Sequence, residues 1–373
     1  MTKDDKGWQW KFISVKIAID TNPIYTTQAG TARYVNGLLR GLRQLSVPDL
    51  SVVPLAWETE NFGYDQPGRI LKTIWRELIW APMIAPFVLR RNATDLLHIT
   101  GGLVISIPRG IKSVHTILDC AVLRNPSRFR RWQRWTGGLR LHRQVVNADR
   151  IICISRFVAE EIMSLLGVPA SRLDVVYLGS DFNDTGNAEE SSPEGMDIQG
   201  EFFLFVGSLE PGKNLNLLRQ VYELASARNV HLPPLIVVGA RWAGVSNEGK
   251  VPGNWIYLGH QPDAVLRYLY RRAIALVFPS KYEGFGLPVL EAMSMGCPVI
   301  CSKVASLPEV GGDAVKYADQ TPGSYYDAML QLMRNNDERQ ILRKLGYEQA
   351  GRFSWCRCVE ETVSVYRSVI EGK

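Results

Sequence analysis

Along two successive stretches of this 373-residue chain, short apolar runs alternate with longer amphipathic patterns. In the first stretch, Val15–Asp20 and Arg150–Ile154 have the apolar, β-branched or aromatic composition of buried strands, as do Phe202–Val206 and Ile274–Phe278 in the second. Strands that alternate with helices predict parallel sheets covered on both faces. We therefore expect an α/β fold with two Rossmann-like, doubly wound domains.

A polar segment separates the two stretches. Residues 181–200 have the sequence DFNDTGNAEESSPEGMDIQG, which lacks apolar periodicity and is typical of a linker. It divides the chain into an N-terminal domain over residues 1–180 and a C-terminal domain over residues 201–353, with an amphipathic helix in residues 354–373. Open α/β sheets bind ligands at the carboxyl ends of their strands, so two such domains predict a cleft between them.

Composition excludes several classes of protein. Apolar residues make up 46% of the chain, yet no apolar run reaches the roughly 18 residues that a membrane-spanning helix needs. The longest, Leu78–Leu89, is too short and contains Pro82 and Pro86. The six cysteines lack the spacing of a zinc site and fit packed thiols in a reducing compartment. Residues 1–11 have no secretory signal pattern, so we expect a cytoplasmic protein.

The strongest local signal is an apolar strand followed by a glycine-rich loop and a helix start, PSKYEGFGLPVLEAMSMGCPVI over residues 279–300. Gly284 and Gly286 would let the backbone approach a ligand closely, and the free amides of the helix start suit an anion or sugar hydroxyls. Glu291, inside that helix, could accept both hydroxyls of a ribose. The alternative is that Glu291 only complements the helix dipole and that Glu283 is an ordinary loop carboxylate.

A second strand–loop–helix turn has the sequence VGSLEPGKN over residues 206–214. Asn214 is a good N-cap for the helix that follows, which puts Lys213 just before a helix N-terminus. A cation there opposes the helix dipole unless an anion also occupies the site. A diphosphate would resolve this conflict, and a solvated loop lysine is the alternative.

The glycine-rich segment resembles glycosyltransferase family 4, a group of retaining transferases with the GT-B fold and a Glu-x7-Glu motif of the form E-G-F-G-L-P-x-x-E. The match runs unbroken from Glu283 to Glu291 and continues through EAMSMGCPVI. The resemblance implies that Glu291 binds the donor ribose and that Glu283 lies beside the transferred sugar. It also implies that sugar hydroxyls and phosphate are held by the loop of Gly284, Phe285, Gly286 and Leu287.

The lysine loop resembles the family pattern G-[RT]-x-x-x-x-K-[GN]. Lys213 occupies the lysine position, but Ser208 stands where an arginine is frequent, so Lys213 would carry a larger share of the phosphate charge. A further match, Tyr257–Gln261, resembles the family segment Y-L-G-x-V, whose backbone touches the base. The resemblance therefore implies a donor site that also includes Ser208, His260 and Gln261.

The first domain carries weaker matches. The loop Asp20–Thr31 lacks G-x-G-x-x-G, which argues against a dinucleotide redox cofactor. It resembles the glycine-containing loop of the family, which implies that Gly30 and Thr31 approach the donor phosphates. Phe353–Trp355 resembles the "F-S-W" that opens the family's final helix, and this implies that the last helix crosses back to the N-terminal, acceptor-binding domain.

The segment VHTILDC over residues 114–120 resembles the family strand end T-I-H-D-L, with one departure. Leu118 stands at the histidine position, and only Asp119 remains. We expect Asp119 to bind the acceptor hydroxyl. His115 is interpreted as a structural strand residue that does not replace the missing histidine.

Charge is distributed unevenly. Residues 1–180 carry 24 Lys and Arg against 14 Asp and Glu, a net charge of +10, whereas residues 181–373 carry 19 against 23, a net charge of −4. The segment Arg128–Trp135 mixes arginine and tryptophan, and the apolar stretch Trp75–Arg91 is flanked by arginines. These segments form either a solvated helix face or a surface that docks on anionic lipid, which would suit a lipid-linked acceptor. No nucleic-acid module accompanies the charge.

The chemistry implied by the family is sugar transfer with retention of anomeric configuration. Negative charge grows on the departing nucleoside diphosphate, and fixed cations and helix N-termini can stabilise it. Because the sequence has no Asp-x-Asp pair, we expect a metal-independent enzyme without a cofactor, with Lys213, Glu283 and Asp119 as its catalytic residues. Retention follows either from double displacement through Glu283 or from same-face attack; Leu118 favours the second, because it removes a polar group.

We therefore expect a hexosyltransferase of bacterial polysaccharide synthesis, acting at the inner face of the membrane on a saccharide or lipid-linked acceptor. UDP-glucose is the favoured donor and GDP-mannose the alternative. Rival interpretations are an epimerase or phosphorylase of the same architecture, although a phosphorylase would need a pyridoxal lysine. A nucleotide-sugar-binding scaffold without catalysis is a further rival, motivated by Leu118 and Ser208.

Overall fold

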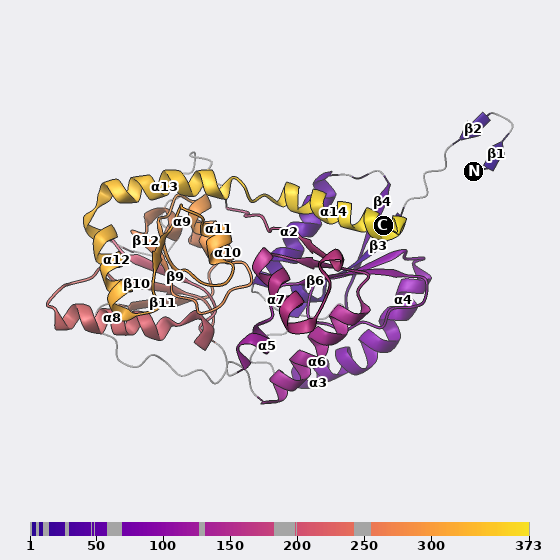
Figure 1. Cartoon of the computed structure of the whole chain (residues 1–373), viewed down its shortest axis with the longest axis horizontal. Helices are drawn as coiled ribbons and strands as arrows, with labels where there is room; N and C mark the ends of the chain where they lie inside the picture. Colours follow the sequence, from indigo (N-terminus) through magenta and orange to yellow (C-terminus); the bar gives the residue numbers. More distant parts are fainter. Residues whose placement is uncertain are drawn as a thin grey trace.

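The computed structural model describes residues 2–4, 7–9, 15–26, 30–45, 47, 49–57, 69–126, 131–182, 198, 200–241 and 255–372. Apart from an antiparallel pair at the start, β1 (Thr2–Asp4) and β2 (Gly7–Gln9), these residues form two lobes, each with a six-stranded parallel sheet and flanking helices (Figure 1). The predicted α/β fold with two doubly wound domains is confirmed.

The N-terminal sheet has a Rossmann-like topology with one reversal of strand order. The first strand of this sheet along the chain, β3 (Val15–Asp20), lies between two other strands. The chain therefore adds the next strand on one side of β3 and the remaining strands on the other side. Ligands bind at such a switch point in open α/β sheets. In spatial order the strands are β4 (Leu50–Leu55), β3 (Val15–Asp20), β5 (Leu96–Ile99), β6 (Lys112–Ile117), β7 (Arg150–Cys153) and β8 (Leu173–Val175).

The C-terminal sheet has the strand order 3-2-1-4-5-6 of a Rossmann fold, counted within the domain. Every residue of its four central strands is buried, which is why they are continuous apolar runs without alternation. In spatial order the strands are β11 (Trp255–Gly259), β10 (Leu235–Val238), β9 (Phe203–Val206), β12 (Ala275–Phe278), β13 (Val299–Ser302) and β14 (Lys316–Ala318).

Helices cover both sheets. In the N-terminal lobe they are α1 (Asn22–Thr26), α2 (Gly30–Leu45), α3 (Arg69–Trp75), the π-helix η1 (Arg76–Ile84), α4 (Ala85–Arg91), α5 (Ala121–Arg124), α6 (Arg131–Asn147), α7 (Arg156–Leu166) and the 3-10 turn η3 (Ala170–Arg172). In the C-terminal lobe they are the 3-10 turn η4 (Pro211–Lys213), α8 (Leu215–Ala227), α9 (Asp263–Arg272), α10 (Leu287–Ser294), α11 (Leu307–Gly311), α12 (Pro322–Arg334) and α13 (Asn336–Ala350).

The last helix, α14 (Trp355–Glu371), leaves the C-terminal lobe and packs on α2 of the N-terminal lobe (Figure 1). Two glycines of α2 make this possible, because a Cβ on Gly37 would lie 2.3 Å from the Trp355 ring and one on Gly41 would lie 2.6 Å from Val359. The chain thus returns to its first domain along a close helix–helix contact.

Local details differ from the sequence-based predictions. The predicted loop Asp20–Thr31 contains the short helix α1, and helix α2 begins within it at Gly30, while Gln28 and Ala29 lie outside the described residues. Asn214 adopts a left-handed conformation (φ 58°), and no side-chain cap bond from it accompanies the start of α8, so its predicted capping role is wrong.

The predicted linker and basic segment lie partly outside the described residues. Of residues 181–200, the structure describes Asp181, Phe182, Ile198 and Gly200; of Arg128–Trp135, residues 128–130 are not described. In the part of the chain that is described, no helix has both the length and the apolar character needed to cross a bilayer.

Candidate active site

A cavity of about 450 Å³ lies between the lobes, within the size range of ligand pockets. It opens at the carboxyl end of β9, where the strand order of the C-terminal sheet reverses. All the site residues predicted from the sequence line this one cavity, together with Leu118: Gly30, Thr31, Asp119, Ser208, Lys213, His260, Gln261, Glu283, Gly284, Phe285, Gly286, Leu287 and Glu291.

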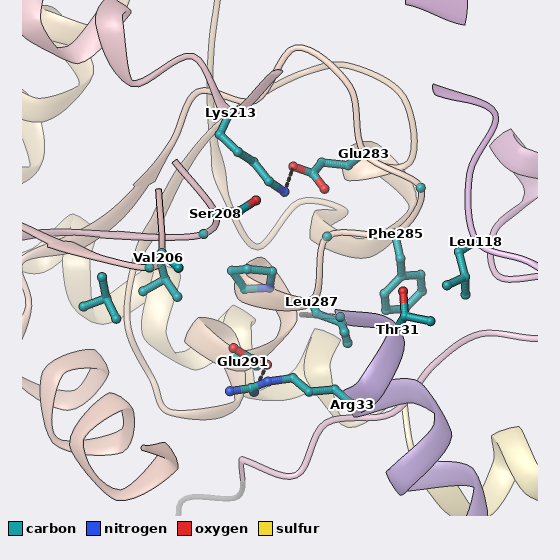
Figure 2. Close-up of a pocket in the computed structure, with 18 of the residues that line it drawn as sticks. Thr31, Arg33, Leu118, Val206, Ser208, Lys213, Glu283, Phe285, Leu287 and Glu291 are labelled. Carbon is teal, nitrogen blue, oxygen red and sulfur yellow. Dashed lines mark hydrogen bonds and ion pairs between the residues drawn. The ribbon is translucent and has the colours of Figure 1, made fainter. Parts of the chain in front are cut away.

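Lys213 forms an ion pair inside the cavity. Its Nζ lies 2.5 Å from Oε1 of Glu283, and both side chains are mostly buried. The same Nζ lies 5.3 Å from the ring centroid of Phe278. The sequence predicted that Lys213 would need an anion, and in this structure the carboxylate of Glu283 supplies it. Figure 2 shows the pair above the cavity, with Ser208 beside it.

The glycine loop brings the two lobes into backbone contact. A Cβ on Gly284 would lie 1.9 Å from the carbonyl oxygen of Leu118, so glycine alone permits this approach. Ser155 of the N-terminal lobe donates to the carbonyl of Gly284 (2.7 Å), and Ser306 donates to the carbonyls of Glu283 and Phe285 (2.9 Å each). The loop is therefore fixed by both lobes, with its amides close to the cavity.

Gly286 shapes the helix start at the end of this loop. It has a left-handed conformation (φ 105°) and precedes α10, whose second residue is Pro288. Positive φ favours glycine, which explains the residue type here. The start of α10 lines the cavity through Gly286, Leu287 and Pro288, so the positive end of the helix dipole lies at the ligand space.

Glu291 is buried in α10, and each of its two carboxylate oxygens accepts a hydrogen bond. Oε1 accepts from Nη1 of Arg33, and Oε2 accepts from the hydroxyl of Tyr270 (3.1 Å). Burial raises the pKa of the Glu291 carboxyl, and the neighbouring Arg33 opposes that shift. Nη2 of Arg33 also lies 2.7 Å from Oδ1 of Asp263.

The N-terminal wall is less charged. Asp119 is exposed, and its Oδ1 accepts from the amide of Ala121 (2.9 Å) at the start of α5. Leu118, at the family histidine position, presents an apolar side chain to the cavity (Figure 2). His115 lies in the buried interior of β6; its ring nitrogens have no hydrogen-bond partner among the described residues, and burial lowers its pKa to about 4.

Sequence reasoning missed two cations that line the cavity, Arg33 and Arg241. Arg33 lies in the first turn of α2, where a cation opposes the helix dipole and calls for an anionic partner, and this was a usable signal. Arg241 follows the end of β10, with its guanidinium carbon 5.8 Å from the ring centroid of Tyr257. Nothing in its local sequence distinguishes it from a surface arginine.

Comparison with known proteins agrees with this geometry. Residues 187–349 match the family model described as "Glycosyl transferases group 1", and residues 29–184 match "Glycosyltransferase Family 4". The O-antigen chain mannosyltransferase B of Escherichia coli is 36% identical over 95% of this chain and 100% of its own length. A D-inositol 3-phosphate glycosyltransferase of Segniliparus rotundus is 27% identical over 73% of this chain and 64% of its own.

Solved structures share the fold at low identity. Sucrose-phosphate synthase from Thermosynechococcus elongatus superposes with a TM-score of 0.71 at 17% identity, over 96% of this chain and 100% of that one. WaaG, a glycosyltransferase involved in lipopolysaccharide biosynthesis, has a TM-score of 0.65 at 15% identity, over 94% and 99% of the two chains.

Two Rossmann-like lobes around a cavity lined by these loops have the GT-B architecture. The chain belongs to glycosyltransferase family 4, and it is an enzyme of the glycosyltransferase class. The predicted family, fold and enzyme class are confirmed. The roles assigned to individual residues remain predictions.

Proposed function

We propose that this glycosyltransferase moves a hexose from a nucleotide-sugar donor to a saccharide or lipid-linked acceptor during bacterial polysaccharide synthesis, with retention and without a metal. The observation that carries the proposal is that Lys213, Glu283, Glu291 and the amides of the glycine loop converge on one cavity at the switch point of the C-terminal sheet. A phosphate-binding cation, a ribose-binding carboxylate and sugar-binding amides are what such a donor needs.

For the donor, two sugars compete. The relative that is 36% identical over its whole length is named a mannosyltransferase, as is WbdA of Escherichia coli, which is 28% identical over 60% of this chain. These names favour mannose, with GDP-mannose as its donor. UDP-glucose, the donor favoured by the sequence, is supported only by fold-level similarity to HepE of Anabaena in complex with UDP-glucose, at 16% identity.

For the reaction, we derive a same-face mechanism. The donor diphosphate would take over the Lys213 ammonium from Glu283, so that negative charge on the leaving group meets a fixed cation. The bond between the anomeric carbon and the phosphate oxygen breaks, and the acceptor oxygen bonds to that carbon on the same face. The acceptor hydroxyl's proton passes to the leaving phosphate oxygen. Glu283, released from Lys213, would stabilise positive charge at the anomeric carbon.

The test is a thermal-shift panel with GDP, UDP, ADP and dTDP, each measured once with EDTA and once with added divalent metal. A nucleotide at 100 times its dissociation constant should stabilise the folded enzyme by about 2.7 kcal/mol. We expect one of GDP and UDP to do so, and Lys213→Ala to lose most of the shift. No shift with any nucleotide would reject the donor site, and a shift that appears only with added divalent metal would reject the metal-free mechanism.

Membrane docking is a second part of the proposal, carried by an exposed apolar surface. Helices η1 and α4 bury Trp80, Ala81, Ala85 and Leu89 in a core against the N-terminal sheet. On the outside, Leu71, Leu78, Met83 and Phe87 are 74%, 68%, 68% and 65% exposed. We call these four residues the apolar helix face. Exposed apolar side chains gathered on neighbouring helices in this way mark protein or membrane contacts.

Basic and aromatic residues surround the apolar helix face. Arg90 and Arg91 are exposed at the end of α4. Helix α6 lies next to η1, joined by an ion pair between Arg140 and Glu77, and exposes Trp135 to 73% (Figure 1). Apolar side chains flanked by arginine and tryptophan suit the interface of an anionic membrane. We propose that the enzyme docks there, at the inner face of the membrane, to reach a lipid-linked acceptor.

Sedimentation with phosphatidylglycerol vesicles tests this docking. Leu78→Glu combined with Phe87→Glu should abolish co-sedimentation, whereas Ile341→Glu, on the C-terminal lobe where Ile341 is 59% exposed, should not change it. Equal binding of all three proteins, or equal binding to uncharged phosphatidylcholine vesicles, would reject docking through this face.

A further inference from the structure

Arg33 belongs to the N-terminal lobe, yet its guanidinium contacts two carboxylates of the other lobe. Nη1 donates to Oε1 of Glu291, and Nη2 lies 2.7 Å from Oδ1 of Asp263. Its guanidinium carbon also lies 5.3 Å from the ring centroid of Phe182. Figure 2 shows the side chain reaching from α2 beneath the glycine loop to Glu291. Because the partners lie on different lobes, these contacts require the lobes to be together.

Glu291 depends on this contact for its charge. Its side chain is only 5% exposed, and an ionised carboxylate is costly to bury without a cation. Three ionisable groups act on it: Arg33 from α2, and Asp263 and Tyr270 from α9. Burial and, to a smaller extent, Asp263 favour the neutral acid, whereas Arg33 and the hydrogen bond from Tyr270 favour the ionised form. The cation that keeps Glu291 ionised therefore comes from the opposite lobe.

We propose that Arg33 is a positioning residue that makes ribose recognition by Glu291 depend on closure of the two lobes. This inference rests on the proposed donor site, in which Glu291 accepts the ribose hydroxyls. Glu291 accepts two hydroxyls well only as a correctly oriented carboxylate, and Arg33 supplies both the charge and the orientation. Coupling of this kind is reciprocal, so a bound ribonucleotide stabilises the closed arrangement as much as closure strengthens its binding.

Glu291 keeps hydrogen-bond acceptor capacity for a ribose in addition to its contact with Arg33. Each carboxylate oxygen can accept two hydrogen bonds, and Arg33 and Tyr270 each use one. Two acceptor positions on Glu291 therefore remain for two hydroxyls. The contrary arrangement, in which Arg33 occupies the ribose position and must be displaced, predicts that removing Arg33 tightens nucleotide binding.

The experiment is a double-mutant cycle measured by calorimetric titration with GDP and UDP and with their 2′-deoxy forms. The proteins are the wild type, Arg33→Gln, Glu291→Gln, the double variant and the control Arg40→Gln. Arg40 lies on the same helix and pairs with Asp181 at the surface. We expect Arg33→Gln to weaken ribonucleotide binding about tenfold, within the usual range of coupling between sites, and 2′-deoxynucleotide binding less.

In the Glu291→Gln background the substitution of Arg33 should have no further effect, because a neutral amide needs no cation. An equal loss in both backgrounds would mean that Arg33 binds the diphosphate directly, and would overturn the proposal. Tighter binding by Arg33→Gln would overturn it in favour of displacement. If the wild type binds neither nucleotide, the donor site itself fails, and this inference fails with it; normal wild-type binding with an unchanged Arg33→Gln rejects the inference alone.

The pH dependence of ribonucleotide binding is a property that a purely structural role of Arg33 would leave unchanged. Ribonucleotide binding should weaken as the pH falls through the pKa of Glu291, and Arg33→Gln should move this loss to higher pH because the opposing cation is gone. Arg33→Lys, which keeps the charge but cannot bridge Glu291 and Asp263 with a planar fork, should shift the profile less. A pH profile that is identical in all three proteins would contradict the proposal.

Discussion

The two walls of the cleft are built on similar parallel sheets but present different chemistry. The C-terminal wall holds buried charges, with Lys213, Glu283 and Glu291 fixed in ion pairs. The N-terminal wall offers the apolar Leu118, the exposed Asp119 and one cation, Arg33, which pairs with Glu291 across the cleft. Buried, oriented charges contribute most to binding where the ligand group that they contact is always the same. Residues on an exposed wall can be substituted with little loss of stability. The comparison supports a donor on the C-terminal side and an acceptor on the other.

The largest difference between the walls should appear in catalysis. Lys213→Ala removes the cation proposed to neutralise the leaving diphosphate, and a loss of this kind costs about 10²- to 10³-fold in rate. Asp119→Asn removes one exposed carboxylate, and we expect a loss of about tenfold or less, mainly in the KM for the acceptor. The measurement is kcat/KM for sugar transfer; losses in the reverse order would break the proposed division of roles.

The next effect concerns the contact between the walls. Gly284→Ala would place a Cβ 1.9 Å from the carbonyl oxygen of Leu118, so the glycine loop must shift away from the N-terminal lobe. Because small displacements of reacting groups are costly, we expect at least a tenfold loss of kcat/KM with folding retained. Gly102→Ala, where the added Cβ meets no atom within 4 Å, is the matched control. Wild-type activity of Gly284→Ala would show that catalysis does not need this approach.

Predictability from sequence also differs between the walls, for a physical reason. The motif from Glu283 to Glu291 is contiguous, so one loop and one helix start determine its geometry, and it could be recognised locally. The pairing of Arg33 with Glu291 joins residues 258 positions apart and depends on how two domains pack. The alternation of strands and helices likewise predicted both sheets, because a strand buried on both faces is a continuous apolar run that can be recognised locally. The packing of the two domains against each other has no such local signal.

The switch point of the N-terminal sheet holds a buried acidic residue. At the end of β3 in the N-terminal sheet, Asp20 is fully buried; its Oδ1 accepts from the amide and side chain of Asn22 (3.1 and 2.7 Å), but its Oδ2 has no hydrogen-bond partner among the residues described. Burial raises the pKa of Asp20 from 3.8 to about 6. Above that pH the ionised carboxylate costs stability, since the unfolded chain ionises more readily.

Asp20→Asn should therefore stabilise the N-terminal lobe at pH 7.5, by about 1 to 3 kcal/mol. As the pH falls from 6 to 4, the native wild type takes up a proton that the unfolded chain does not, so the advantage of the variant should fade. Thermal unfolding at pH 7.5 and pH 4.5 measures both. A variant that is less stable at pH 7.5 would indicate that the Asp20 carboxylate has a partner that favours its ionised form.

The smallest expected effect lies at a second link between the lobes. Glu309 of α11 accepts hydrogen bonds from the amides of Arg156 and Phe157 at the start of α7 (2.8 and 2.7 Å) and from the hydroxyl of Tyr177 (3.1 Å). A carboxylate at a helix N-terminus contributes about 0.3–1 kcal/mol through the dipole. Glu309→Gln should lower unfolding stability by roughly that amount without changing nucleotide affinity. A large loss of nucleotide binding would make this link part of the donor site.

The most direct test of the account is a calorimetric titration of the donor nucleotide, GDP or UDP, into the wild type, Glu291→Gln and Asp119→Asn. If the C-terminal wall binds the donor, Glu291→Gln should lose most of its affinity while Asp119→Asn keeps the affinity of the wild type. If Asp119→Asn loses the nucleotide and Glu291→Gln retains it, the donor lies on the N-terminal wall, and the assignment of the two sides is contradicted.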